Sequence, residues 1–88
     1  MIRTHCVANG CVGVIDEDDG PLCDVIRAAL DLWNEEKSGQ CYIMTDDEDN
    51  PIVTLLRDKD DYEIAHLTWH DGRRETWRSH DTKVTRLN

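Results

Sequence analysis

The chain of 88 residues is long enough for one domain, because domains typically span about 50–250 residues. It is 39% hydrophobic and 33% charged, contains three Trp and no Phe, and carries a formal net charge of −9. An acidic surface of this kind repels nucleic-acid phosphates and anionic lipid, and the chain lacks the run of roughly 18 apolar residues that a membrane span needs.

The acidic charge is concentrated in the first two thirds of the chain. Residues 1–61 hold 15 acidic and 5 basic residues, whereas residues 62–88 hold 4 acidic and 5 basic ones. Two clusters of four acids stand out: Asp16, Glu17, Asp18 and Asp19, and then Asp46, Asp47, Glu48 and Asp49. Such clusters attract basic protein surfaces, and simple solubility is the alternative explanation.

The last third of the chain contains a small basic strip. Its members are Arg73, Arg74, Arg78, Lys83 and Arg86. These side chains could contact phosphate groups against the overall charge, or they could pair with the acidic loops of the same or a second copy.

Four cysteines are present at positions with no paired CxxC spacing: Cys6, Cys11, Cys23 and Cys41. The first ten residues have no signal-peptide pattern, so we expect a cytoplasmic, reducing environment in which these thiols stay free. A zinc site built from the four cysteines is the alternative, although it has no sequence signature. The prediction is therefore no metal and no cofactor.

The N-terminal segment predicts a β-hairpin and then a helix. Ile2–Ala8 and Cys11–Ile15 are rich in strand-forming residues, and Asn9-Gly10 between them is a strong type I′ turn signal. That turn pairs Val7 with Val12, His5 with Val14 and Cys6 with Gly13. An acidic turn over Asp16–Gly20 then leads to Pro21, which is favoured at the first position of a helix.

The helix is predicted from about Leu22 to Lys37, with Gly39 as its left-handed cap. Its apolar residues recur at helical spacing and form a single packing stripe, made of Leu22, Val25, Ile26, Ala29, Leu30 and Trp33. The opposite face is acidic, which excludes a membrane-surface helix.

The rest of the chain predicts five strands, at Gln40–Met44, Ile52–Leu56, Tyr62–Trp69, Arg74–Ser79 and Val84–Leu87. The hairpin between the third and fourth of these can have a two-residue or a three-residue loop, and a shift of one residue moves every side chain to the other face. We favour the three-residue loop His70-Asp71-Gly72, because it pairs Ala65 with Trp77 and keeps Trp77 on the core face.

The fold class predicted from these elements is α+β: an N-terminal hairpin, one amphipathic helix, and a five-stranded antiparallel sheet. The second half of the chain contains Ile64–Gly72 with its Trp-His-Asp-Gly turn, then Glu75-Thr76-Trp77, and then Val84–Leu87. In these residues the segment 39–87 resembles the small SH3-like barrels of tudor or chromo-like modules, including short phage and bacterial proteins of unassigned role. The resemblance implies about five short strands in a strongly bent sheet or an SH3-like barrel. Recognition of methylated lysine is not inferred, because the sequence offers no clear aromatic cage.

Catalytic chemistry is not predicted. The neighbouring pairs His5-Cys6 and Ser79-His80 would point to opposite faces of a strand, so neither places a nucleophile beside a base. Calcium binding fails as well, because Gly20 and Arg57 occupy positions where an EF-hand loop needs oxygen ligands.

Two functional hypotheses follow. The first is a non-enzymatic module, monomeric or homodimeric, whose two acidic clusters bind a basic protein surface. In its sharper form it mimics the charge of nucleic acid and blocks a nucleic-acid-binding protein, as small phage-encoded inhibitors do. The second is a small barrel that binds nucleic acid through the basic strip.

Overall fold

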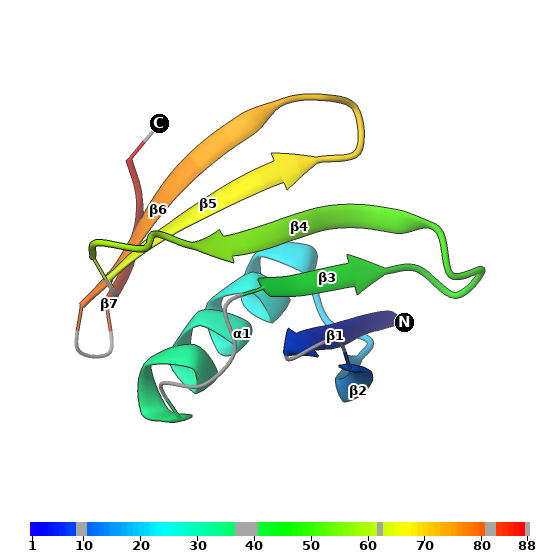
Figure 1. Ribbon diagram of the computed structural model, residues 1–88. Helices are drawn as coiled ribbons and strands as arrows, with labels where there is room; N and C mark the ends of the chain where they lie inside the picture. Colours follow the sequence, from blue (N-terminus) through cyan, green and yellow to red (C-terminus); the bar gives the residue numbers. More distant parts are fainter. Residues whose placement is uncertain (9–10, 37–40, 62, 81–82, 88) are drawn as a thin grey trace.

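In the residues that the structure describes, seven antiparallel strands form one continuous sheet, and a single helix packs against one of its faces (Figure 1). The computed structural model describes residues 1–8, 11–36, 41–61, 63–80 and 83–87. The elements are β1 (Ile2–Ala8), β2 (Cys11–Asp18), α1 (Leu22–Glu36), β3 (Cys41–Thr45), β4 (Pro51–Arg57), β5 (Ile64–Trp69), β6 (Arg74–His80) and β7 (Lys83–Arg86).

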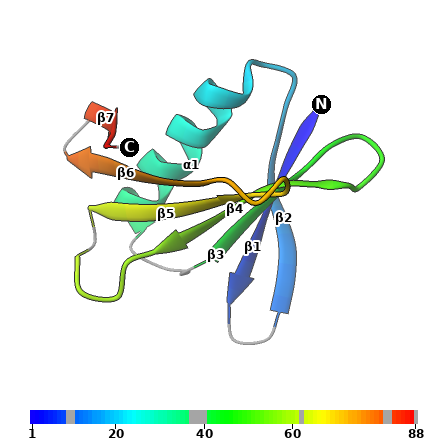
Figure 2. The ribbon, with the colours of Figure 1, turned by 90° about the horizontal axis from the view of Figure 1, so that it is seen from above.

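The predicted fold class is wrong in its architecture. The N-terminal hairpin is not separate from a five-stranded sheet or barrel, because Arg3–Val7 of β1 pairs with Cys41–Thr45 of β3. The strand order is β2-β1-β3-β4-β5-β6-β7, so the sheet is open and ends at β2 and β7. Its strong twist turns the first strands across the direction of the last ones (Figure 2).

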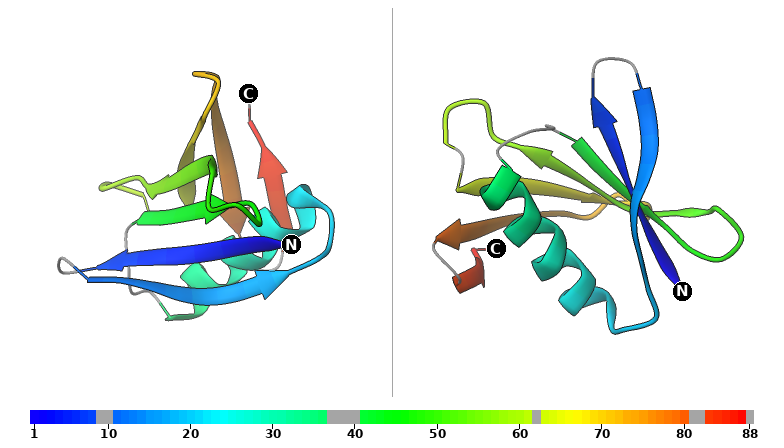
Figure 3. Two further views of the ribbon diagram at one scale, coloured as in Figure 1. Left: turned by 90° about the vertical axis from the view of Figure 1, so that its right-hand side faces the viewer. Right: turned by 90° about the horizontal axis from the view of Figure 1, so that it is seen from below.

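The helix connects β2 to β3 and carries the chain across the face of the sheet (Figures 1 and 3). Residues Val25, Ile26, Ala29 and Leu30 of the predicted stripe are buried, as expected. The side chain of Trp33, the predicted end at Lys37 and the predicted cap at Gly39 lie outside the described residues.

The core lies between α1 and alternate residues of the central strands. These residues are Tyr42 and Met44 on β3, Val53 and Leu55 on β4, Ala65 and Leu67 on β5, and Trp77 on β6. Strand pairing brings them together on one face, since Tyr42 is opposite Leu55, Leu55 is opposite Leu67, and Ala65 is opposite Trp77. The period of two along each strand is what places them there.

Both predicted hairpin registers are confirmed. In the first hairpin Val7 is opposite Val12, while Asn9 and Gly10 of the predicted turn lie outside the described residues. In the second, the amide of Gly72 donates to the Trp69 carbonyl at 3.0 Å, and Gly72 has a φ of 95°. A side chain at that φ is strained, so glycine is favoured in this three-residue loop.

Candidate functional site

The structure brings the two acidic clusters to the same end of the sheet. The predicted turn over Asp16–Gly20 is wrong for its first three residues. Asp16–Asp18 continue β2 and pair with Ile2–Thr4 of β1. The loop of the second cluster leaves β3 just beyond Thr45, which pairs with Arg3 of β1. The loop therefore lies beside the N-terminus (Figure 2). The insertion of β1 between β2 and β3 is what makes the clusters neighbours.

Two cations bridge the clusters. Nε of Arg3 lies 3.3 Å from Glu17 Oε1, and its Nη1 lies 3.1 Å from Asp49 Oδ1. The terminal ammonium of Met1 lies 3.6 Å from Asp19 and 3.1 Å from Asp47. The hydrogen bond to Asp47 raises the pKa of that ammonium group above its usual value. The two clusters therefore form one surface, which we call the acidic end.

Two of the eight acids organise the backbone at this end. Oδ1 of Asp46 accepts hydrogen bonds from the amides of Glu48 and Asn50, each at 2.9 Å, and closes the loop. The Asn50 amide is the main reason that the pKa of Asp46 is lowered. Asp18 accepts from the amide of Gly20 at 2.7 Å before the helix begins.

The other six acids of this end are exposed: Asp16, Glu17, Asp19, Asp47, Glu48 and Asp49. Eight carboxylates against Arg3 and the terminal ammonium leave a net charge of −6 at the acidic end. This is most of the formal charge of the molecule, concentrated on one part of a body whose extents are 33 × 28 × 23 Å. A field of this kind steers a positively charged partner toward the end.

The predicted basic strip is not one surface. Arg78 on β6 lies on the face of the sheet turned away from α1, whereas Arg86 on β7 is opposite Trp77, whose side chain faces the helix. Arg73 stands in the loop before β6 and packs over the Trp69 ring. Alternation along the strands therefore separates side chains that are close in sequence.

Acidic neighbours also pair with three of the five basic residues. Arg78 lies 2.7 Å from Glu63, Arg73 lies 2.8 Å from Asp71, and Arg86 lies 3.2 Å from Glu75. Arg74 and Lys83 are exposed. Because most of its charge is compensated, the strip is poorly suited to hold a phosphate backbone.

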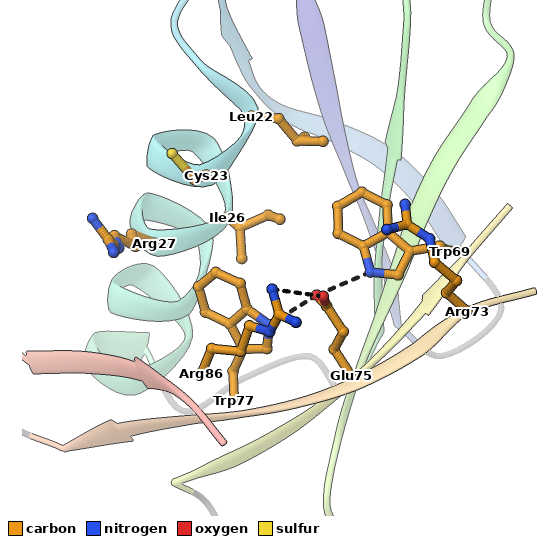
Figure 4. A pocket seen from close by; sticks show the side chains of 9 residues that line it. All are labelled: Leu22, Cys23, Ile26, Arg27, Trp69, Arg73, Glu75, Trp77 and Arg86. Atoms are coloured by element: carbon orange, nitrogen blue, oxygen red, sulfur yellow. Dashed lines mark hydrogen bonds and ion pairs between the residues drawn. The ribbon is translucent and has the colours of Figure 1, made fainter. Parts of the chain in front are cut away.

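Sequence reasoning missed Glu75, which is at the centre of a partly buried polar cluster (Figure 4). Its Oε2 accepts hydrogen bonds from Nε1 of Trp69 at 3.0 Å and from Nε1 of Trp77 at 3.2 Å. Its other oxygen lies 3.2 Å from Arg86, and its side chain is only 10% exposed. The favoured hairpin register already placed Glu75 on the core face, between two Trp residues, and that was the available signal.

The cysteines show no metal centre in the described residues. Cys6, Cys23 and Cys41 are free, and no three side chains of the metal-binding types gather anywhere in that part of the chain. Burial, with a smaller effect from Cys6, raises the pKa of the Cys41 thiol. The side chain of Cys11 lies outside the described residues.

No helix in the described part of the chain is both long and apolar enough to cross a membrane. Comparison of the chain with models of known families, with curated proteins and with solved structures finds no match. The resemblance of residues 39–87 to small-barrel modules stays a prediction.

The ion pairs of Glu63 predict that the protein loses stability as the pH falls into the acid range. The hydrogen bond from His80, followed by contacts with Arg78, lowers the pKa of Glu63. A carboxyl group whose pKa is lowered by folding stabilises the protein above its unfolded pKa of about 4.3, and this stability is lost as the pH falls through the folded value. We expect Glu63→Gln to be less stable than wild type at about pH 6 and to approach it at about pH 3.

Denaturant unfolding of both proteins across this range measures the difference. His66→Gln, which removes a second histidine–carboxylate contact, the one with Asp58 at 2.8 Å, reports whether the effect is local to Glu63. A stability difference between wild type and Glu63→Gln that is the same at both pH values would contradict the prediction.

Proposed function

We propose that the protein is a non-enzymatic binding module whose acidic end docks on a basic surface of a partner protein. The observation that carries the proposal is the bridging of the two acidic clusters by Arg3, at 3.3 Å from Glu17 and 3.1 Å from Asp49. Residues 16–19 and residues 46–49 are distant in sequence, yet the fold joins them into one charged surface.

Three features support binding rather than solubility alone. The charge is concentrated on one end instead of being spread over the molecule. The loop that carries half of it is held by the Asp46 carboxylate, so its acids are presented on an ordered backbone. Ordering before binding reduces the entropy that association must overcome. The exposed acids also surround the two cations, so a basic partner would meet carboxylates first.

In the sharper form of the proposal, the acidic end imitates the charge of a nucleic acid and blocks a protein that binds one. A row of carboxylates can occupy arginine and lysine side chains that otherwise contact phosphates. The free thiols of Cys6, Cys23 and Cys41 suit a reducing cytoplasm, and the proposal requires only a monomer, although a homodimer would present two such ends.

A charge-matched pair of variants tests the proposal. The first variant, Glu17→Gln/Asp47→Asn/Glu48→Gln, removes three exposed charges from the acidic end and leaves Asp46 and Asp18 in place. The second, Asp24→Asn/Asp31→Asn/Asp60→Asn, removes three exposed charges elsewhere. Both variants have the same net charge, so a non-specific effect of charge would change the amount of captured partner equally for the two.

Tagged proteins are used to capture partners from a nuclease-treated bacterial lysate at low and high salt, with identification by mass spectrometry. We expect wild type and the second variant to retain one basic protein, and the first variant to retain about tenfold less of it. The sharper form further expects that the retained protein no longer binds its nucleic acid in the presence of the wild-type chain. Equal capture by both variants, or the absence of any retained protein in the nuclease-treated lysate, would refute the proposal.

A further inference from the structure

A pocket of about 440 Å³ opens between the first turns of α1 and the hairpin of β5 and β6 (Figure 4). Leu22 and Ile26 line it from the helix, and Trp69 and Trp77 line it from the sheet. It lies apart from the acidic end, whose contacts all involve β1, β2 and the loop after β3. Pockets for small ligands are typically about 300–1,000 Å³ and are lined mainly by apolar and aromatic side chains.

The Glu75 cluster fixes the two indoles that line this pocket. Both indole N–H groups donate to the same carboxylate oxygen, so neither ring offers an unpaired donor toward an incoming molecule. Trp77 is buried and Trp69 is half-buried. The ring surface that they contribute is therefore apolar and held in place, which suits a flat, apolar partner better than a flexible polar one.

The charges around the pocket have the opposite sign to those of the whole molecule. Arg27, Arg73 and Arg86 line it, with Glu75 as its single acid. Arg86 lies 3.2 Å from Glu75 and compensates that carboxylate. Arg73 stacks on the Trp69 ring at 5.1 Å and is paired with Asp71 through Nε, which uses one of its five N–H donors. With both ion pairs counted, the three arginines outnumber Glu75 and Asp71 by one, and this slightly positive pocket in a chain of net charge −9 favours a ligand that is itself negative.

We propose that this pocket binds a small molecule that combines a flat aromatic ring with an acidic group. The ring lies against the indoles, Leu22 and Ile26, and the acidic group lies beside the Arg73 guanidinium. A long polyanion such as single-stranded nucleic acid fits less well, because the remainder of the surface would repel its other phosphates. The proposal does not depend on the function of the acidic end.

Two probes that differ by one acidic group test the proposal on the full chain. Anilinonaphthalene sulfonate is a flat aromatic anion, and N-phenylnaphthylamine is the same ring system without the sulfonate. Each becomes fluorescent on entering an apolar site, and quenching of tryptophan emission reports contact with the indoles. We expect one saturable site for the sulfonate, with an affinity about tenfold higher than that of the uncharged probe.

Two arginine substitutions locate the site. Arg73→Gln should weaken binding of the sulfonate about fivefold, because it removes the positive charge that contacts the acidic group. Binding of the uncharged probe should not change, since the Arg73 side chain is 65% exposed and its replacement leaves the core intact. Arg74→Gln is the matched control, since this exposed neighbour does not line the pocket. Naphthoate should displace the sulfonate, and acetate should not.

Four results would overturn the proposal. These are no saturable binding of the sulfonate, equal affinity for the two probes, equal effects of Arg73→Gln and Arg74→Gln, or displacement by a single-stranded oligonucleotide but not by naphthoate. The last of these would instead identify a nucleic-acid site.

Discussion

The substitution Leu55→Ala is expected to lower the free energy of unfolding by about 2–5 kcal/mol, the range observed when a buried leucine is truncated in a packed core. Leu55 is fully buried on β4, opposite Tyr42 on one side and Leu67 on the other. A domain of this size has a total stability of about 5–15 kcal/mol, so the loss removes a large part of it. Denaturant unfolding followed by tryptophan fluorescence gives the value.

The adjacent residue provides the control. Leu56 follows Leu55 on the same strand, points to the opposite face of the sheet and is 50% exposed. Leu56→Ala removes the same atoms and should change the unfolding free energy by no more than about 0.5 kcal/mol. Similar losses for the two variants would mean that the far face of the sheet is covered as well, contrary to the structure.

The second large effect is expected at Glu75. Glu75→Leu replaces the carboxylate with an apolar side chain and leaves both indole N–H groups without their acceptor. An unpaired buried donor costs about 1–3 kcal/mol, and Arg86 also loses its partner. Because Trp69 is only half-buried, we expect a total loss of about 2–4 kcal/mol.

Glu75→Gln separates the two contributions to this loss. The amide oxygen still accepts from the indoles, while the negative charge beside Arg86 is gone, so the expected loss is only about 1 kcal/mol. Thermal or denaturant unfolding of the three proteins should show stability decreasing from wild type to Glu75→Gln and then to Glu75→Leu. If Leu were as stable as Gln, the indole hydrogen bonds would contribute little.

Local structure could be predicted from the sequence to a large extent. Strand-forming residues between turn signals identified the strands, and the helical spacing of Val25, Ile26 and Ala29 identified the buried side of α1. Turn chemistry at Asn9-Gly10 settled the first hairpin register, whereas the second was chosen between two loop lengths because one of them keeps Trp77 on the core face. Each of these signals acts over a few residues.

The architecture and the site depended on a contact that no local signal specifies. The pairing of β1 with β3 joins residues 3–7 to residues 41–45 across a helix, and hydrophobic alternation on either strand is the same whichever neighbour it has. Without that pairing the hairpin was assigned as a separate unit. For the same reason the sequence showed two acidic clusters but not their common location, and it overlooked Glu75 as the partner of two indoles.

The position of β1 between β2 and β3 has a consequence for the order in which the molecule is made and folded. During synthesis the β1–β2 hairpin emerges before α1 and β3, so the edge of β1 that will pair with β3 stays open until both have followed. A contact between residues so distant in sequence is slow to form, because a long loop must close first. The exposed backbone edge is meanwhile available to another chain. The ribosome-bound hairpin is thus the stage at which this protein is most open to intermolecular strand pairing, and chaperone protection would matter most there.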